Sequence, residues 1–373
     1  RSGAPISPLQ SWMNPLMNEP LKTGAVIGIL GGGQLGRMLC SAASRLGLRA
    51  HIFDPASAPP AADVAYATTC AAYEDEAALR RFAADVDVIT YEFENIPTSA
   101  LDILEKLCPI RPGREALRIS QDRLTEKDFL TGLGLKTAPY RAVDTRQDLS
   151  EAVDALGLPA ILKTRRFGYD GKGQARLSTQ EDQAPAIADM AGQAAILEGF
   201  ISFSKEISII GARNSAGDVA CFDPGENIHH AGILRTTSVP AQINATQRMD
   251  AVLLAAKIMN ALDYVGVMGV ELFVTGQGLI VNEIAPRVHN SGHWTQNGCA
   301  VDQFEQHIRA IANWPLADGS RHSDVTMKNL IGNDLDALEA LSSQAGTALH
   351  LYGKAEIKPG RKMGHYNSVR PKS

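Results

Sequence analysis

A short apolar segment that leads directly into a glycine cluster and then a helical pattern constrains the fold of this chain more than any other feature. Ala25 to Leu30 predicts a buried strand, Gly31, Gly33 and Gly36 predict a tight turn, and residues 38–46 predict a helix. The alternation continues with a strand, a helix and a strand at residues 49–53, 77–84 and 86–91. Because such alternation builds a parallel sheet covered by helices, the sequence predicts a Rossmann-like α/β domain.

The pattern changes after this domain. A helix is expected at residues 122–133, and from Ala160 onward short apolar runs joined by glycine-containing turns predict a mixed α+β region. After Pro315 short strands lead to a basic end, where a small C-terminal β-rich unit is expected. The first residues are typical of a disordered leader or a cloning scar. The expected boundaries are 1–23 for the leader, 24–122 for the α/β domain, 123–314 for the mixed domain and 315–373 for the C-terminal unit.

Composition excludes several classes of protein. Hydrophobic residues make up 45% and charged residues 21%, as in an ordinary globular protein. The net charge of −5 argues against sequence-independent binding to nucleic acid, which needs a basic surface. The five cysteines are scattered and form no CxxC pair, so a reducing cytoplasm is the expected location. No apolar run approaches the ~20 residues that cross a bilayer, so no membrane association is expected.

The first glycine cluster has more than one interpretation. Gly31, Gly33 and Gly36 form a GxGxxG pattern between strand and helix, and Asp54 follows a second strand, as in a dinucleotide-binding fingerprint. On this motif alone a nicotinamide-dependent oxidoreductase is the first choice of function. A sugar phosphate at the helix N-terminus would satisfy the same backbone donors, and a tight turn without any ligand is also common.

Two apolar segments, 265–274 and 279–284, are separated by a glycine-containing turn, and each carries one glutamate. This pattern predicts a β-hairpin. With a three-residue loop at 276–278, Glu271 falls directly opposite Glu283 on one face, with Cβ atoms ~5 Å apart. Like charges so placed destabilise a sheet unless a cation lies between them, and Mg²⁺ on ATP phosphates fits because hard cations prefer oxygen ligands. The alternative is that both carboxylates face water at an edge.

A second glycine-rich segment carries a cluster of cations. Lys163 ends a short apolar strand, and residues 163–173 contain three glycines together with Lys163, Arg165, Arg166 and Lys172. A loop of this composition can fold over a triphosphate, offering backbone N–H donors and lysine charge while excluding water. A basic surface hairpin is the alternative, because the segment is not a Walker A sequence.

With these motifs on one chain, the sequence resembles the ATP-grasp superfamily and, within it, the 5-(carboxyamino)imidazole ribonucleotide synthetases of purine biosynthesis. The resemblance covers about residues 24 to 370 and rests on the motifs ILGGGQLGRM (29–38), YEFENIP (91–97), DRLTEK (122–127), GYDGKGQ (168–174), HNSGHWTQNG (289–298) and PGRKMGH (359–365). It implies an ATP-grasp fold with an N-terminal pre-ATP-grasp domain and a lid subdomain at about 130–198. It also implies a homodimer.

The resemblance implies an ATP site with magnesium. Arg123 and Lys163 would contact the phosphates, Glu206 would take the ribose hydroxyls, and His229 would lie near the nucleotide. The loop over the phosphates would consist of Gly168, Tyr169, Asp170, Gly171, Lys172, Gly173 and Gln174. The adenine hinge would consist of Glu198, Gly199, Phe200 and Ile201. The metal ligands would be Glu271 and Glu283, next to Asn282, whereas Ala285 stands where many ATP-grasp enzymes carry a third ligand, an asparagine.

The implied reaction phosphorylates bicarbonate with ATP to carboxyphosphate, and the exocyclic amine of 5-aminoimidazole ribonucleotide then captures the carboxyl group. ADP and phosphate are released. The ribonucleotide's phosphate and ribose would lie near Gly33, Gln34, Leu35 and Glu92, so the first glycine cluster would hold a sugar phosphate. Arg287 would stabilise the acyl phosphate. The other side chains expected at the amine, carboxylate or phosphate are Asp170, His289, Asn290, Lys354, Arg361 and Lys362.

Two other functions are compatible with the sequence. One is another ATP-grasp ribonucleotide ligase or formyltransferase, such as a glycinamide ribonucleotide formyltransferase. The other is the nicotinamide oxidoreductase indicated by the GxGxxG pattern. For the basic residues between 354 and 365, charge pattern alone favours a solvated tail as much as a binding site.

Overall fold

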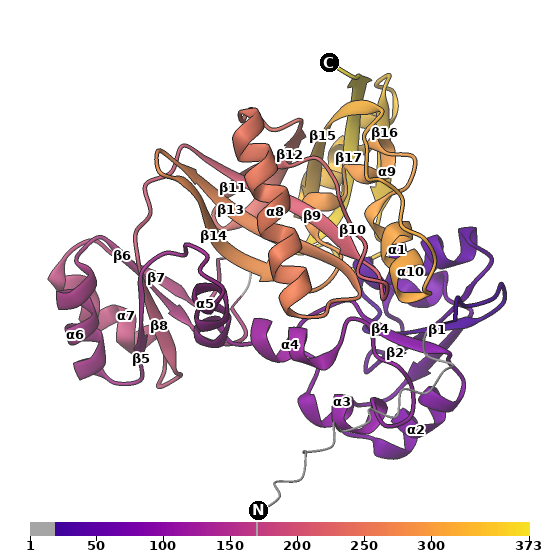
Figure 1. The fold of residues 1–373 in the computed structure, drawn as a ribbon, viewed down its shortest axis with the longest axis horizontal. Helices are drawn as coiled ribbons and strands as arrows, with labels where there is room; N and C mark the ends of the chain where they lie inside the picture. Colours follow the sequence, from indigo (N-terminus) through magenta and orange to yellow (C-terminus); the bar gives the residue numbers. More distant parts are fainter. Residues whose placement is uncertain (1–18, 169–170) are drawn as a thin grey trace, which may run out of the picture.

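The structure, a computed structural model, describes residues 19–168 and 171–373. Most of the predicted leader, together with Tyr169 and Asp170, lies outside the described residues. Three sheets organise the chain: an N-terminal sheet, a small antiparallel sheet and a large sheet that continues to the C-terminus (Figure 1).

The N-terminal sheet has four parallel strands in the order β3-β2-β1-β4. They are β1 (Val26–Leu30), β2 (Arg49–Asp54), β3 (Ala67–Cys70) and β4 (Val88–Tyr91). Successive residues of β1 point to opposite faces, so Ile29 packs in a core with α1 (Gln34–Arg45) and Leu30 in a core with α2 (Glu76–Ala84). The remaining helices are η2 (Pro60–Asp63), α3 (Thr98–Leu104) and α4 (Arg114–Ser120). The predicted Rossmann-like domain is confirmed, although α1 begins earlier than predicted, directly after its N-cap Gly33.

A second, antiparallel sheet in the order β5-β8-β6-β7 lies at the left of Figure 1 and follows α5 (Arg123–Gly132). Its strands and helices are β5 (Tyr140–Val143), α6 (Arg146–Leu156), β6 (Ala160–Thr164), β7 (Gln174–Leu177), η3 (Gln180–Asp182), α7 (Gln183–Asp189) and β8 (Ala195–Gly199). α6 starts with a capping box between Thr145 and Asp148. Leu149, Leu162 and Leu197 belong to a core of their own. The sheet is therefore an independently packed unit in the range expected for the lid.

The large sheet has nine strands, in the order β14-β13-β9-β11-β12-β15-β17-β16, with β10 paired to β9. The strands are β9 (Lys205–Arg213), β10 (Val219–Cys221), β11 (Gly225–His230), β12 (Ile233–Val239), β13 (Gly266–Thr275), β14 (Gly278–Ala285), β15 (Ser323–Ile331), β16 (Thr347–Leu351) and β17 (Lys362–Pro371). Val270 and Leu272 pack under α8 (Ala245–Ala261), so Glu271 points to the opposite face. Because β12 pairs with β15, the C-terminal strands extend this sheet.

The face opposite α8 is covered by short helices and by the N-terminal domain. The helices on this face are η4 (Asn290–Gly292), α9 (Thr295–Gly298) and α10 (Gln303–Ile311), whereas η5 (Gly332–Ala337) and α11 (Leu338–Ser342) follow β15 and lie beside Lys328 and Tyr366 on the other face. Leu39 of α1, Ile308 of α10 and Met327 of β15 belong to one buried cluster. The N-terminal domain and the large sheet therefore share a hydrophobic core.

His307 on α10 joins these two parts by hydrogen bonds. Its Nδ1 accepts from the Val267 backbone N–H on β13 at 3.0 Å, and its Nε2 lies 2.8 Å from the Thr90 hydroxyl on β4. Because Nδ1 accepts, Nε2 carries the proton and donates to Thr90. The ring is fully buried, and burial lowers the pKa of His307 to about 3. The joint therefore requires a neutral imidazole.

We expect acid to weaken this joint. Below pH 6.5, the ordinary histidine pKa, His307 is protonated in the unfolded chain. In the folded chain its ring stays neutral down to about pH 3. The free energy of unfolding therefore falls with decreasing pH, by about 1.4 kcal/mol per pH unit for this residue. His307→Asn keeps an acceptor for Val267 but does not titrate, so urea denaturation from about pH 6.5 to 5 should show a shallower pH dependence. Exposed His322→Asn is the control, and an unchanged slope in His307→Asn would contradict the assignment.

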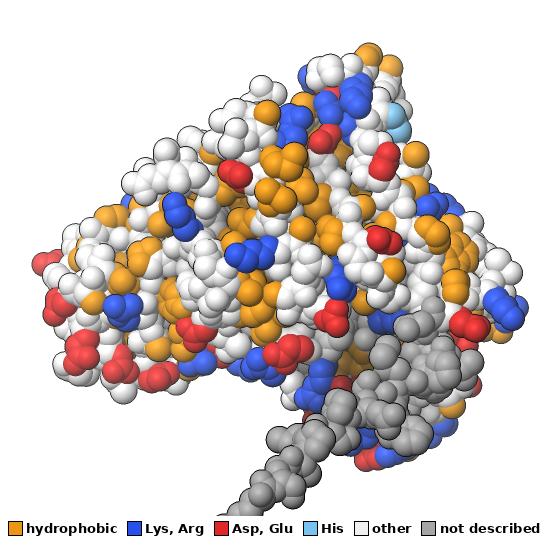
Figure 2. Space-filling model, viewed as in Figure 1, with side chains coloured by type: hydrophobic (Ala, Val, Ile, Leu, Met, Phe, Trp, Pro, Cys, Tyr) orange, Lys and Arg blue, Asp and Glu red, His pale blue; other side chains and the backbone are white. Residues whose placement is uncertain are grey.

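The face drawn in Figure 2 carries interspersed acidic and basic side chains, and hydrophobic side chains gather near α8, where Met249 and Leu253 are exposed. Within the described part of the chain, no helix combines the length and apolar character needed to cross a membrane.

Candidate active site

The β13–β14 hairpin brings two glutamates face to face. Thr275 pairs with Gly278 across a two-residue turn, so the predicted three-residue loop is wrong. That register alone would set Glu271 opposite Asn282. A bulge after Glu271 adds one residue to β14, however, and Glu271 pairs with Glu283. The predicted pairing is confirmed, with the bulge in place of the longer loop.

The two carboxylates lie in an environment that suits a cation. Burial and the neighbouring Glu283 raise the pKa of Glu271 to about 7, although the Asn282 side chain bonds to it. Burial also acts to raise the pKa of Glu283, but Arg123 outweighs it by donating to Glu283 Oε2 at 3.0 Å, and that pKa is lowered. A divalent ion would relieve the repulsion that otherwise favours protonation of Glu271.

The donor set fits Mg²⁺ bound together with phosphate. Across residues 19–168 and 171–373, no three His, Cys, Asp or Glu side chains gather closely enough to hold a metal ion. Glu271 and Glu283 would thus supply two ligands, and phosphate and water oxygens the others, as is usual for magnesium at nucleotide sites. The apolar Ala285 at the end of β14 agrees with this division.

Two lysines converge on Glu198, the first residue of the expected adenine hinge. Lys163 on β6 donates to Glu198 Oε2 at 2.9 Å, and Lys127 on α5 lies 3.7 Å from the same oxygen. Lys127 also donates to the Asn282 carbonyl at 2.8 Å and thereby ties α5 to the carboxylate hairpin. Glu198 Oε1 is buried and has no hydrogen-bond partner among the described residues, so it can accept from a ligand. The other residues of the expected hinge, 199–201, follow directly.

Glu206 on β9 and His229 on β11 lie side by side on the face that carries Glu271. His229 Nδ1 is 2.5 Å from Glu206 Oε2. Burial acts to lower the pKa of His229, but the hydrogen bond to Glu206 and the charges of Glu271 and Glu283 outweigh it, and the pKa is raised. The expected ribose ligand therefore lies next to the expected metal ligands.

The second glycine loop reaches from the lid sheet to the large sheet. A Cβ atom at Gly171 would lie 3.1 Å from Gly232 Cα, so the loop passes closely over the β11–β12 turn. The positive φ of Gly171, +77°, also favours glycine. Arg123 Nη2 donates to the Gly168 carbonyl at 3.5 Å, which is a weak contact. Tyr169 and Asp170, both expected in the site, lie outside the described residues.

The first glycine turn is closed by carboxylates of the protein itself. Glu92 accepts from the Gly36 N–H at 2.7 Å and from the Gly33 N–H, and a Cβ atom at Gly33 would collide with Glu92 Oε1. Asp54 accepts from the Gly32 N–H at 2.7 Å. In dinucleotide-binding folds such donors face a pyrophosphate and the acidic residue binds a ribose. Their engagement within the protein argues against the nicotinamide interpretation.

His289 and Asn290 lie in the segment that follows the carboxylate hairpin. His289 Nε2 is 3.6 Å from Glu271 Oε1. Burial, followed by the charges of Arg287 and Lys362, holds the pKa of His289 well below its ordinary value, so the ring is neutral at pH 7. Both side-chain polar atoms of Asn290 are buried without a partner in the described part of the chain.

The basic C-terminal residues are partly fixed by backbone carbonyls. Lys354 Nζ donates to the Lys362 carbonyl at 2.7 Å, and Arg361 Nη1 donates to the Glu356 carbonyl at 3.0 Å. Lys362 is the first residue of β17, and its charge acts to lower the pKa of His289, after burial and the charge of Arg287. Arg361 is the residue directly before β17.

Three charged residues of the site were not selected from the sequence: Glu94, Glu126 and Lys127. Glu94 pairs with Arg287 at 2.6 Å. Burial and the charge of Glu283 raise the pKa of Glu126 to about 8. All three fall within the motifs YEFENIP and DRLTEK, which could have indicated them. A motif does not, however, show which of its side chains point to the site.

Comparison with known proteins assigns the chain to a family. Three domain families match: ribonucleotide synthetase preATP-grasp domain (25–121), ATP-grasp domain (128–304) and phosphoribosylaminoimidazole carboxylase C-terminal domain (325–373). The N5-carboxyaminoimidazole ribonucleotide synthase of Brucella melitensis is 52% identical over 356 residues, which is 95% of this chain and 98% of that protein. The chain belongs to the N5-carboxyaminoimidazole ribonucleotide synthase family.

Solved structures from this family have the same fold. N5-carboxyaminoimidazole synthetase of Staphylococcus aureus, complexed with ADP, is 38% identical with a TM-score of 0.91, over 95% of this chain and 96% of that one. N5-carboxyaminoimidazole synthase of Aspergillus clavatus, in complex with ADP and 5-aminoimidazole ribonucleotide, is 31% identical with a TM-score of 0.88, over 94% of each chain. The predicted ATP-grasp fold, with its pre-ATP-grasp and C-terminal domains, is confirmed.

Proposed function

We propose that this chain is an ATP-grasp ligase that carboxylates the exocyclic amine of 5-aminoimidazole ribonucleotide in purine biosynthesis, with ATP and bicarbonate as co-substrates. The position of Arg287 carries the proposal. Arg287 follows the carboxylate hairpin, and its Nη2 is 2.6 Å from Glu94 Oε1, two residues beyond the Glu92 that closes the first glycine turn. In this proposal the phosphoryl-transfer site and the site of the second substrate would thus lie on either side of one guanidinium group.

The residues of the nucleotide side have distinct tasks in this proposal. Lys163 and Arg123 neutralise ATP phosphates, and Glu206 binds the ribose. A magnesium ion held by Glu271 and Glu283 would offset the negative charge of the β- and γ-phosphates. The second glycine loop would cover the phosphates and exclude water, which matters because carboxyphosphate is short-lived in water.

The chemistry proceeds in two displacements. A bicarbonate oxygen attacks the γ-phosphorus, and ADP leaves. The exocyclic amine then attacks the carboxyl carbon of carboxyphosphate, the bond to the phosphate oxygen breaks, and the amine loses a proton. The first step brings the bicarbonate anion to a negatively charged phosphate, and the second develops negative charge on the carboxyl oxygens and on the departing phosphate. The fixed positive charge of Arg287 would therefore lower both barriers. Neutral His289 can bind the amine or the carboxyl group, and so can Asn290, whose amide has no partner among residues 19–168 and 171–373.

The proposal predicts coupled ADP formation. With purified protein and Mg²⁺, ADP release is expected only when bicarbonate and 5-aminoimidazole ribonucleotide are both present, and removal of magnesium by EDTA should stop it. A requirement for formate in place of bicarbonate would indicate a formyltransferase instead. A fluorescence change on titration with NADH or NADPH would favour the oxidoreductase, and absence of coupled ADP release would refute the proposal.

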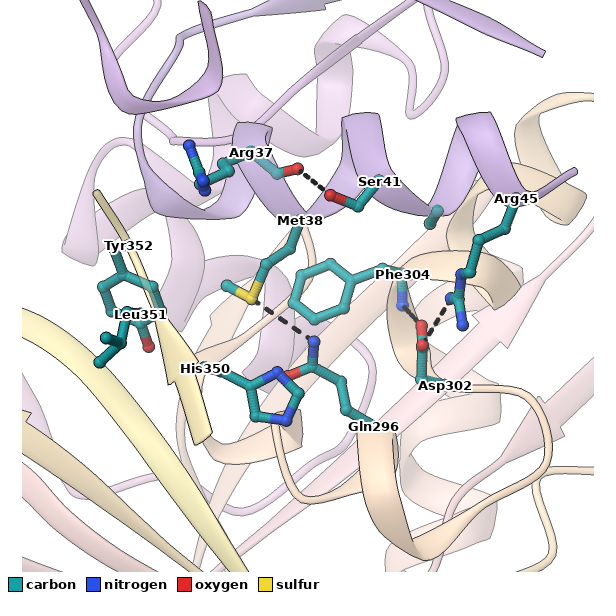
Figure 3. Close-up of a pocket in the computed structure, with 11 residues that line it drawn as sticks. Arg37, Met38, Ser41, Arg45, Gln296, Asp302, Phe304, His350, Leu351 and Tyr352 are labelled. Atoms are coloured by element: carbon teal, nitrogen blue, oxygen red, sulfur yellow. Dashed lines mark hydrogen bonds and ion pairs between the residues drawn. The ribbon is translucent and has the colours of Figure 1, made fainter. Parts of the chain in front are cut away.

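We also propose that the chain forms a homodimer. β16 is the last strand of the large sheet, and Leu351 on it is 44% exposed. Beside it lies a cavity of about 240 Å³ lined by Met38 and Ser41 of α1 and by Phe304 of α10 (Figure 3). An edge strand with an exposed apolar side chain favours association. Sedimentation equilibrium tests the proposal, and a mass of one chain at micromolar concentration would contradict it.

A further inference from the structure

Arg287 lies at a point where two domains meet. It follows β14 of the large sheet, and its side chain is 18% exposed. The carboxylate in closest contact with it comes from the N-terminal domain: Arg287 Nη2 is 2.6 Å from Glu94 Oε1. Glu94 belongs to the segment that follows β4. The proposed catalytic arginine is therefore held by a residue on the other side of the domain boundary.

The hydrogen bonds of Arg287 leave one edge of its guanidinium group available. Nη2 contacts Glu94, and Nη1 donates to the Val288 carbonyl at 3.0 Å. Nε is buried and has no partner among the described residues, and the same holds for the nearby hydroxyl of Tyr91, whose pKa responds to both Arg287 and Glu94. A buried donor without a partner is costly unless a ligand or water satisfies it. The contact with Glu94 thus determines which edge of Arg287 faces a ligand.

Glu94 is itself fixed by its surroundings. Buried Gln121 donates from Nε2 to the Glu94 carbonyl at 2.7 Å and to the Ile96 carbonyl at 2.8 Å. Two residues before Glu94, Glu92 accepts from the Gly33 and Gly36 N–H groups. One short segment therefore connects the first glycine turn to Arg287 and leaves little freedom to either contact.

We propose that Glu94 is a positioning residue for the carboxyl transfer, which orients Arg287 so that its Nε edge meets the reacting carboxyl group. The proposal rests on the proposed function. Glu94 touches neither ATP nor the amine in this scheme, and acts only through Arg287. A misoriented Arg287 leaves ATP binding intact but stabilises carboxyphosphate poorly, so that part of it hydrolyses before the amine reacts.

Glu94→Gln tests this role, because it keeps the shape of the side chain and removes its charge. We expect kcat for product formation to fall about 10- to 100-fold, the KM for ATP to stay within about twofold, and the ratio of ADP to product to rise above one. Glu94→Asp keeps the charge and is expected to recover part of the rate. Asp223→Asn is a matched control, since Asp223 is 25% exposed, like Glu94, and pairs with Arg321 at 2.6 Å. We expect that variant to keep the wild-type ratio.

The outcomes separate this inference from the proposed function. If wild-type protein forms no ADP in response to bicarbonate and ribonucleotide, the proposed function fails. If wild-type protein is active and Glu94→Gln keeps its kcat and its ADP-to-product ratio, the positioning role is refuted. The role is also refuted if Glu94→Gln raises the KM for ATP as strongly as it lowers kcat, because that pattern indicates general damage to the fold.

Discussion

Replacing Glu283 with glutamine is expected to lower the turnover of ATP by about 1000-fold or more while the protein remains folded. The change keeps the volume of the side chain but removes half the charge of the carboxylate pair. It also removes the carboxylate that pairs with Arg123 at 3.0 Å. Glu271 alone would be a weak ligand set for the proposed magnesium ion, so the β- and γ-phosphates would lose the charge compensation that phosphoryl transfer requires.

ADP formation at saturating magnesium measures the effect of Glu283→Gln, and circular dichroism checks the fold. Glu226→Gln is the matched control. Glu226 is a glutamate of the same large sheet that pairs with Lys205 at 2.8 Å, but its neighbour in the ladder, Ile207, packs on the α8 side. That variant is expected to keep the wild-type rate. Substantial turnover by Glu283→Gln at high magnesium concentration would rule out a metal-binding role.

The second large effect is expected at Lys127. Its side chain is 2% exposed, and its Nζ donates to the Asn282 carbonyl at 2.8 Å and lies 3.7 Å from Glu198 Oε2. Lys127→Met removes the donor to the buried Asn282 carbonyl. It also removes one of the two lysines close to Glu198, while Lys163 remains. Breaking a buried charge pair on one side typically costs about 3 to 5 kcal/mol. We expect a loss of about 3 kcal/mol in the free energy of unfolding, together with weaker ATP binding.

Urea denaturation and ATP titration measure the two effects. Lys136→Met is the control, because Lys136 Nζ contacts the Gln277 carbonyl at the exposed end of the same hairpin, at 3.3 Å. A surface change of this kind is expected to stay within about 0.5 kcal/mol. If Lys127→Met lost less than about 1 kcal/mol, the buried lysine would not be essential to the joint between α5 and β14.

The sequence was informative where local pattern determines geometry. The glycine turn between β1 and α1 follows from residue types a few positions apart, and so does the β13–β14 hairpin. The opposed glutamates were predicted with a three-residue loop, whereas the chain reaches the same pairing through a bulge at Asn282. Loop length and bulge have the same effect on register, so side-chain alternation alone does not distinguish them.

The contacts that assemble the site join residues far apart in the sequence, so local sequence patterns could not predict them. Lys127 meets Asn282 across 155 positions, and Arg123 meets Glu283 across 160. The Glu94–Arg287 contact joins two domains in the same way. Charged residues in an α5-type helix or a loop are usually solvated, and only the fold shows that these are buried against partners. The resemblance identified the motifs, but the structure shows which of their side chains pair with one another.

The carboxylate of Glu92 has a consequence for how the acceptor molecule is oriented. It accepts hydrogen bonds from the Gly33 and Gly36 N–H groups, and so occupies the donors that an anion at the start of α1 would need. A carboxylate accepts hydrogen bonds from sugar hydroxyls but repels a phosphomonoester. We therefore expect the acceptor to lie with its sugar toward Glu92 and its phosphate toward Lys354 and Lys362, which replaces the expectation that the first glycine cluster holds the phosphate. The site would thus distinguish the phosphate end of a nucleotide monoester from its other end. Molecules that carry negative charge at both ends would bind weakly.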